Sequence, residues 1–188
     1  MAQCKASSLF SGALSLLFAI PNAALAFSAG APICEVNTLP LLDMSPTLAV
    51  PAPTGWYLES DRLTYQADRS LELRIRNANG SKQVRGVLLF AKSGPNSGAG
   101  RFTLPISGAF QYIPKAQECG EWAISHTSAS PKPQTQLQFN WSAPPSGTVI
   151  VRAFLIEDCP QPSGGCRDQQ ALTPVLILQE ALFVDGFE

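Results

Sequence analysis

Two segments of the chain alternate apolar and polar residues with a period of two, the pattern of a strand buried on one side. Residues 71–76 alternate with charged side chains, so we expect Leu71, Leu73 and Ile75 on one buried face. Residues 137–141 alternate in the same way, between large apolar side chains and amides. Each segment is therefore predicted to be a strand with one face in a core and the other in water.

Further segments predict strands in other environments. Residues 84–91 contain an apolar run, 87–90, that occupies both faces, which is typical of a central strand. Residues 148–156 are rich in β-branched side chains, which favours another strand. Short strands are expected near residues 63–65 and 175–178. The chain therefore predicts many strands, joined by turns.

Proline and glycine mark those turns. Residues 77–80, Asn-Ala-Asn-Gly, predict a turn because Asn and Gly tolerate positive φ. Residues 143–147 include Pro144 and a second proline, which lack the N–H donor that a strand ladder requires. We therefore predict that 137–141 and 148–156 form a hairpin around Trp141. Trp141 is interpreted as a core residue, with a carbohydrate-stacking platform as the alternative.

The longest glycine-rich loop is SGPNSGAGR, residues 93–101. Exposed N–H groups of Gly94, Gly98 and Gly100 would suit a phosphate. However, no Lys-Ser/Thr pair follows and no helical pattern begins after the loop. We therefore predict a plain hairpin connection.

The N-terminus has the pattern of a signal peptide. Lys5 supplies a positive charge, residues 9–20 are apolar, and residues 24–26, Ala-Leu-Ala, place small side chains where a signal peptidase cleaves. The apolar run is shorter than the ~20 residues of a membrane-spanning helix. We expect cleavage between Ala26 and Phe27, no membrane anchor, and a soluble protein that is extracellular or periplasmic.

Cleavage would remove Cys4 and leave Cys34, Cys119, Cys159 and Cys166, which in an oxidising compartment indicates two disulfides. Three pairings are possible, and the short separation of Cys159 from Cys166 favours a local loop. Cys34 then pairs with Cys119. A cysteine-based metal or redox site is disfavoured, because the sequence contains no CxxC pair.

Composition restricts the fold and the partners. The chain has 188 residues with 16 prolines and 14 glycines, so long helices are difficult to place and an all-β fold is expected. The 162 residues that follow the predicted cleavage site suffice for one domain with a core. The net charge of −1 becomes −2 without Lys5, and there is no basic run, so we expect no nucleic-acid partner.

A series of motifs now points to a family. The series is Cys119, a strand ending His126-Thr127, a Phe-x-Trp-x-Ala-Pro segment at 139–144, and a strand ending Arg152-Ala153. It resembles the reeler (reelin-type) domain. Residues 86–91 and 100–102 are similar to the family's Phe-x-Gly-Phe-Leu-Leu-x-Ala and Gly-x-Phe strands, and Cys34 with residues 43–46 resembles its opening cysteine and Met-x-Pro segment.

The resemblance implies an immunoglobulin-like antiparallel β-sandwich stapled by disulfides, and its first cysteine pairing also joins Cys34 to Cys119. We expect a signal peptide over 1–26, an irregular lead-in over 27–55, the sandwich over 56–180 and a tail over 181–188. The resemblance also implies structural roles for four residues: His126, Trp141, Pro144 and Arg152.

The only histidine, His126, invites a catalytic interpretation. A general base needs a nucleophile and an orienting carboxylate, and a zinc site needs three or four ligands. No Gly-x-Ser-x-Gly or His-Glu-x-x-His segment supplies them. We therefore expect no catalytic residue, no metal and no cofactor. A Ser-His-Asp site, or a copper site that includes Met44, is the alternative.

These observations predict a secreted, monomeric, non-enzymatic binding or adhesion module of reeler type, whose partner is an unknown extracellular protein or glycan. The alternatives are a defence or antimicrobial effector and an accessory metal or electron-transfer protein. Asn79 and Asn140 begin glycosylation sequons, of which Asn79, in a turn, suits a glycan better. The ending Asp-Gly-Phe-Glu, residues 185–188, resembles that of exported Gram-negative bacterial proteins and favours a bacterial source.

Overall fold

The computed structural model describes residues 30–31, 33–35, 55–95, 97–113, 119–158 and 169–181. The predicted signal peptide with Ala26 and Phe27, and the Cys159–Cys166 pair, lie outside these residues. Within them the secondary structure is strand, apart from two short 3-10 turns, η2 (Gly120–Trp122) and η3 (Gln134–Gln136). The predicted all-β fold is confirmed.

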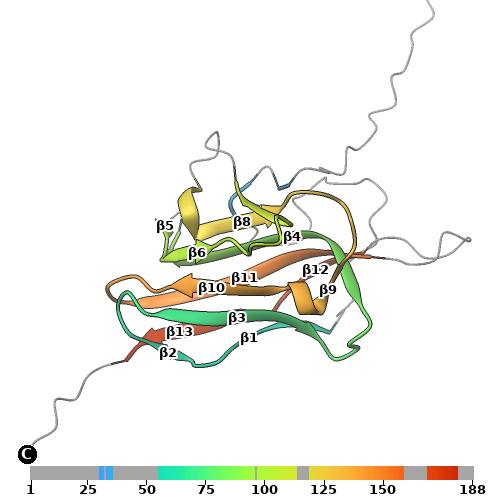
Figure 1. The fold of residues 1–188 in the computed structure, drawn as a ribbon. Coiled ribbons are helices and arrows are strands. Elements are labelled where there is room, and N and C mark those ends of the chain that lie inside the picture. The colour runs from blue at the N-terminus through green and yellow to red at the C-terminus, as the bar shows by residue number, and fades with distance from the viewer. Residues whose placement is uncertain are drawn as a thin grey trace, which may run out of the picture.

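The described strands form two sheets that pack face to face (Figure 1). The smaller sheet has the order β1-β3-β10-β6, with β1 (Trp56–Ser60), β3 (Ser70–Asn77), β10 (Gln138–Ser142) and β6 (Arg101–Thr103). All its neighbouring strands are antiparallel. Its inner face is the predicted one, since Leu71, Leu73 and Ile75 are at most 4% exposed.

The larger sheet is built around two long strands, β4 (Gln83–Gly94) and β11 (Thr148–Glu157). The other members are β2 (Thr64–Tyr65), β5 (Ser97–Gly98), β7 (Phe110–Tyr112), β8 (Ala123–His126), β9 (Lys132–Pro133), β12 (Gln169–Leu172) and β13 (Leu176–Glu180). The path runs β2-β13-β11-β4-β8-β7, with β12 beside β11 and with β5 and β9 beside β4. Every pair is antiparallel except β2 with β13, which is parallel. Four of these strands, β5, β7, β9 and β12, had no counterpart in the sequence pattern.

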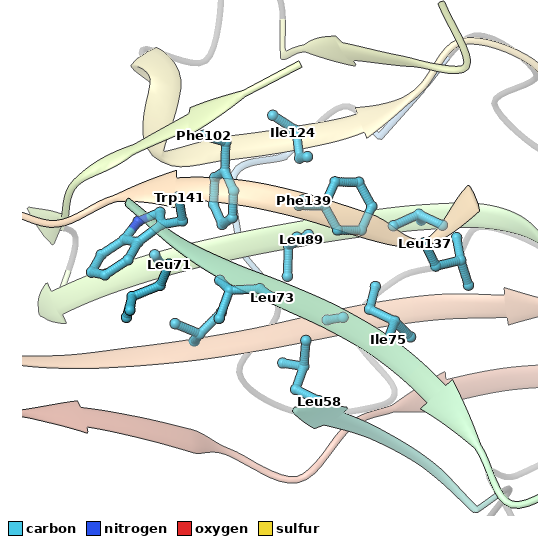
Figure 2. Close-up of a cluster of buried hydrophobic side chains, with 14 of the residues drawn as sticks. Leu58, Leu71, Leu73, Ile75, Leu89, Phe102, Ile124, Leu137, Phe139 and Trp141 are labelled. Atoms are coloured by element: carbon cyan, nitrogen blue, oxygen red, sulfur yellow. The ribbon is translucent and has the colours of Figure 1, made fainter. Parts of the chain in front are cut away.

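The core between the sheets is aliphatic and aromatic (Figure 2). Leu73 and Leu89, from opposite sheets, are fully buried, and each such leucine contributes roughly 1.5–3 kcal/mol. Phe110 and Phe139 pack edge to face, with ring centroids 4.9 Å apart. These contacts hold the two sheets together as one sandwich.

The predicted hairpin around Trp141 is wrong. β10 pairs with β3 and β6 in the smaller sheet, whereas β11 pairs with β4, β12 and β13 in the larger one. The proline-containing segment 143–147 crosses between the sheets, helped by Gly147 at φ 105°. The alternation of apolar and polar residues predicts which side of a strand faces the core. It does not predict to which of the two sheets the strand belongs, because both sheets of a sandwich turn an apolar face inward.

The segment 93–101 likewise does more than join two neighbouring strands. β5 pairs with the end of β4, as a hairpin requires, in the register Lys92 with Gly98. The chain then crosses to β6 in the smaller sheet. The segment is therefore a short hairpin followed by a crossover.

The larger sheet has a second core on its outer face. Leu88 and Phe90 of β4 and Phe154 of β11 pack there with Ala31 and Cys119. The Cys34–Cys119 disulfide, with its Cα atoms 5.2 Å apart, fastens residues 30–31 and 33–35 over this face. The run that is apolar on both faces of β4 is thereby explained, because both of its faces are covered.

Candidate functional site

His126 lies at the end of β8 and is only 3% exposed. The Val87 N–H donates to His126 Nδ1 at 3.1 Å. Neighbouring Ser125 accepts a hydrogen bond from the Ala31 N–H at 2.7 Å and donates its own hydroxyl hydrogen to the Val87 carbonyl at 2.8 Å. The Ser125 Oγ also lies 3.3 Å from His126 Nδ1. Both side chains are buried and bonded to backbone groups of other segments, so the Ser125–His126 pair joins three segments of the fold.

Trp141 is fully buried. Its indole N–H donates to the Ala99 carbonyl at 3.1 Å, and its ring meets Tyr65 edge to face with centroids 5.9 Å apart. The polar atom is satisfied and both ring faces lie in the core. Trp141 therefore offers no platform on which a sugar could stack.

Arg152 fastens the chain between β12 and β13. Its Nε donates to the Thr173 carbonyl at 2.9 Å, and the Ala153 N–H donates to Thr173 Oγ1 at 3.0 Å. Burial lowers the pKa of Arg152 below its ordinary value. Pro144 is half-buried in the segment that crosses between the sheets. Neither residue lines either of the two hollows described below.

The glycine-rich segment accommodates tryptophans. A Cβ on Gly98 would lie 2.0 Å from the Trp122 ring, and one on Gly100, at φ 65°, would lie 2.5 Å from the Trp141 ring. Both positions therefore exclude any side chain, because an aromatic ring already occupies that space. Gly98 and Gly100 thus serve packing against the two tryptophans.

The other sequence candidates supply no chemical site in the described residues. The described part of the chain has no group of three His, Cys, Asp or Glu that could hold a metal, and Met44 lies outside it. Nor does that part contain a helix long and apolar enough to cross a bilayer. Asn79 is exposed in its turn, where its Oδ1 accepts from the Ser81 hydroxyl at 2.7 Å.

Lys132 is a buried cation that the sequence pattern did not reveal. It is 2% exposed, and its Nζ donates to the carbonyls of Arg85, Ser128 and Ser130 at 3.1, 2.6 and 2.8 Å. Burial lowers the pKa of Lys132. These contacts tie the loop after β8 to β4, which is a structural role.

The outer face of the smaller sheet differs from that of the larger one. It is polar, and ion pairs cross it between strands, such as Arg76 with Glu59 at 3.3 Å and Arg74 with Glu59 at 3.6 Å. Glu72 also pairs with Arg74. On this face the acidic and basic groups therefore offset each other, and no apolar cluster of the described chain covers it.

A groove of about 400 Å³ opens on this face beside β6, within the size range of small-ligand sites. Glu72 of β3 and Gln138 and Asn140 of β10 contribute polar side chains, and Thr103 stands at the end of β6. The segment 104–106, Leu-Pro-Ile, forms an apolar wall. The groove is thus lined by two side-chain amides, a hydroxyl, a paired carboxylate and an aliphatic wall.

Pro105 explains why the groove exists. β6 pairs with β10 only from Thr103 opposite Asn140, so Pro105 stands where a partner of Gln138 would be. Proline has no N–H to donate and therefore ends the ladder. The peptide groups of successive strand residues point alternately to the two neighbouring strands. The Ala143 N–H donates to the Arg69 carbonyl on the β3 side, so the peptide groups of Asn140 and Gln138 point toward β6. In the described chain, the Gln138 peptide has no strand partner on this side.

A second hollow, of about 340 Å³, lies near β2 and the start of β3. Its lining includes the charged residues Asp61, Arg62 and Arg69 together with Tyr65. The Tyr65 hydroxyl already donates to the Gly147 carbonyl at 2.6 Å. This hollow lacks the pair of adjacent amides that distinguishes the groove beside β6.

The groove residues carry no distinctive local signal in the sequence. The amide positions 138 and 140 could be recognised only as the wet side of a strand, a description that fits most polar strand residues. Their importance depends on β6 ending beside them, which is a non-local feature. Pro105 was the one local signal, since a proline after a short strand indicates a break in pairing.

Comparison with known proteins identifies the architecture. The family model described as the Reeler domain matches residues 42–159. No curated protein matches the chain.

Solved structures of F-spondin share the fold. The crystal structure of the human F-spondin reeler domain (fragment 1) is similar at 20% identity and a TM-score of 0.52, over 68% of this chain and 89% of that one. Fragment 2 of the same domain is 20% identical with a TM-score of 0.51, over 68% of this chain and 93% of that one. The crystal structure of the Reelin-N domain of F-spondin is also 20% identical, with a TM-score of 0.52, over 68% and 87%.

Proposed function

Because the chain belongs to the reeler domain family, we propose that it is a secreted, non-enzymatic binding module that engages its ligand with the outer face of the smaller sheet. The observation that carries this proposal is the asymmetry between the two outer faces. Residues 30–31 and 33–35, with the Cys34–Cys119 disulfide, cover the apolar part of the larger sheet's outer face that Leu88, Phe90 and Phe154 form. The outer face of the smaller sheet contains the groove beside β6 and presents polar groups to solvent.

The fate of the reactive side chains supports a non-enzymatic role. Ser125 and His126 are buried and bonded to the backbone of other segments, and Lys132 is enclosed by three carbonyls. General acid–base chemistry requires such a group within reach of a substrate. Each of these groups instead stabilises the fold.

The test is a binding screen with the full chain produced for secretion. Immobilised protein is exposed to glycans, extracellular-matrix polymers and cell surfaces, and binding is measured by surface plasmon resonance. We expect saturable binding to at least one of them, undiminished in His126→Ala once folding is verified by circular dichroism. Hydrolase turnover that disappears in His126→Ala would overturn the non-enzymatic proposal, and absence of any binding would overturn the binding role.

A further inference from the structure

The groove beside β6 has the chemistry of a site for an uncharged, hydroxyl-rich ligand. Gln138 and Asn140 are two residues apart on β10, so their side chains project on the same outer face. Both residues are exposed, and together their amides offer donors and acceptors to one ligand. Adjacent hydroxyls of a ring can be bound by such mixed donors and acceptors.

The charges around the groove favour a neutral ligand. Glu72 is opposite Asn140 in the register of β3 and β10, and its carboxylate is paired with Arg74. Arg74 is in turn opposite Gln138. An anionic ligand would have to compete with Glu72 for Arg74, and a cation would have to compete with Arg74 for Glu72. A neutral ligand avoids both costs and can still accept or donate hydrogen bonds.

The apolar wall fits the other side of such a ligand. Ile106 is fully exposed, with Leu104 and Pro105 behind it, half-buried. A sugar ring has C–H groups on its faces and hydroxyls around its rim, so it matches an aliphatic wall beside a row of amides. The Gln138 peptide group adds a donor and an acceptor that no strand uses, as described above.

We propose that this groove binds a neutral saccharide through the Gln138 and Asn140 amides, the Gln138 peptide group and the aliphatic wall at Ile106. This inference rests on the proposed binding function and specifies its ligand class and site. The volume of about 400 Å³ suits one or two sugar rings. Without an aromatic stacking partner, binding to a single site is weak, and avidity on a polymer strengthens it.

The test uses the full secreted chain and isothermal titration calorimetry, with cello-, xylo-, manno- and chito-oligosaccharides as neutral probes and heparin as the anionic probe. The double variant Gln138→Ala/Asn140→Ala removes both amides. The matched control is Gln179→Ala, an exposed glutamine on β13 of the other sheet. We expect one neutral series to bind, tenfold or more weaker in the double variant and unchanged in the control.

Each other outcome overturns a defined part of the account. Neutral-saccharide binding that survives the double variant places the site elsewhere. Binding to heparin or to a protein, with no neutral oligosaccharide bound, refutes the ligand class but leaves the binding function standing. Absence of binding to every probe, glycan, matrix polymer and cell surface refutes both. If the double variant does not fold, Ile106→Ser replaces it, since that side chain is fully exposed, and the same tenfold loss is expected.

Discussion

Replacing both cysteines of the Cys34–Cys119 disulfide by alanine is expected to destabilise the protein substantially. The two cysteines are 85 residues apart, and closing a loop of this length contributes about 4.5 kcal/mol to the free energy of unfolding through the entropy of the unfolded chain. For a domain of this size, such a loss lowers Tm by roughly 9–18 °C. Alanine is preferred to serine because Cys119 is fully buried and a hydroxyl there would add a desolvation cost.

The loss has a local signature as well as a global one. The disulfide fastens residues 30–31 and 33–35 over the second core, where the Ala31 N–H also donates to Ser125 Oγ. We expect hydrogen exchange at the Ala31 N–H to accelerate in the variant even below its Tm, while the amides of β10 stay protected. Urea unfolding without reductant measures the free energy, and exchange detected by NMR measures the local effect. A loss below about 1 kcal/mol, with Ala31 still protected, would refute the reasoning.

Three further substitutions or conditions test the packing and the charges. Gly98→Ala is expected to lower the free energy of unfolding by about 1–3 kcal/mol and to alter tryptophan fluorescence, because the new Cβ collides with Trp122. In the control Gly94→Ala the new Cβ meets nothing within 4 Å, so urea unfolding of this variant should be nearly unchanged. Lys132→Met leaves three partly buried carbonyls without their donor and should cost about 2 kcal/mol by thermal unfolding; an unchanged Tm would contradict the role given to Lys132. Burial, and secondarily the nearby Glu180 carboxylate, raise the pKa of Tyr65 above its ordinary value of 10.0. The contribution of Tyr65 to the free energy of unfolding is therefore complete below pH 10 and is lost as the pH rises through the folded-state pKa. Tyr65→Phe should remove this part of the alkaline destabilisation, and identical pH profiles of stability for the two proteins would refute the raised pKa.

The sequence determined which side of each strand faces the core more reliably than it determined the partners of the strands. Alternation placed Leu71, Leu73 and Ile75 correctly, and it also predicted that Trp141 is buried. These predictions depend only on local geometry. The pairing of β10 depends instead on which sheet receives it, and the predicted hairpin was wrong because the proline segment crosses the sandwich.

The second core and the groove were also beyond local reasoning. The apolar run on both faces of β4 indicated a central strand, but the segment that covers its outer face is more than fifty residues away and is held by Cys34. The groove arises because Pro105 ends β6 opposite Gln138, and only the sheet register brings those two residues together. Sequence patterns identify strands, whereas sites between strands require the topology.

The most direct test of the account is an NMR titration of the full secreted chain with the neutral oligosaccharide that binds best in the calorimetric screen. The account predicts that the side-chain amide signals of Gln138 and Asn140 and the methyl signals of Ile106 shift together with one binding isotherm, while the signals of His126 remain unchanged. Shifts confined to the surroundings of His126, or to the hollow near β2, would contradict the assignment of the smaller sheet's outer face as the binding surface.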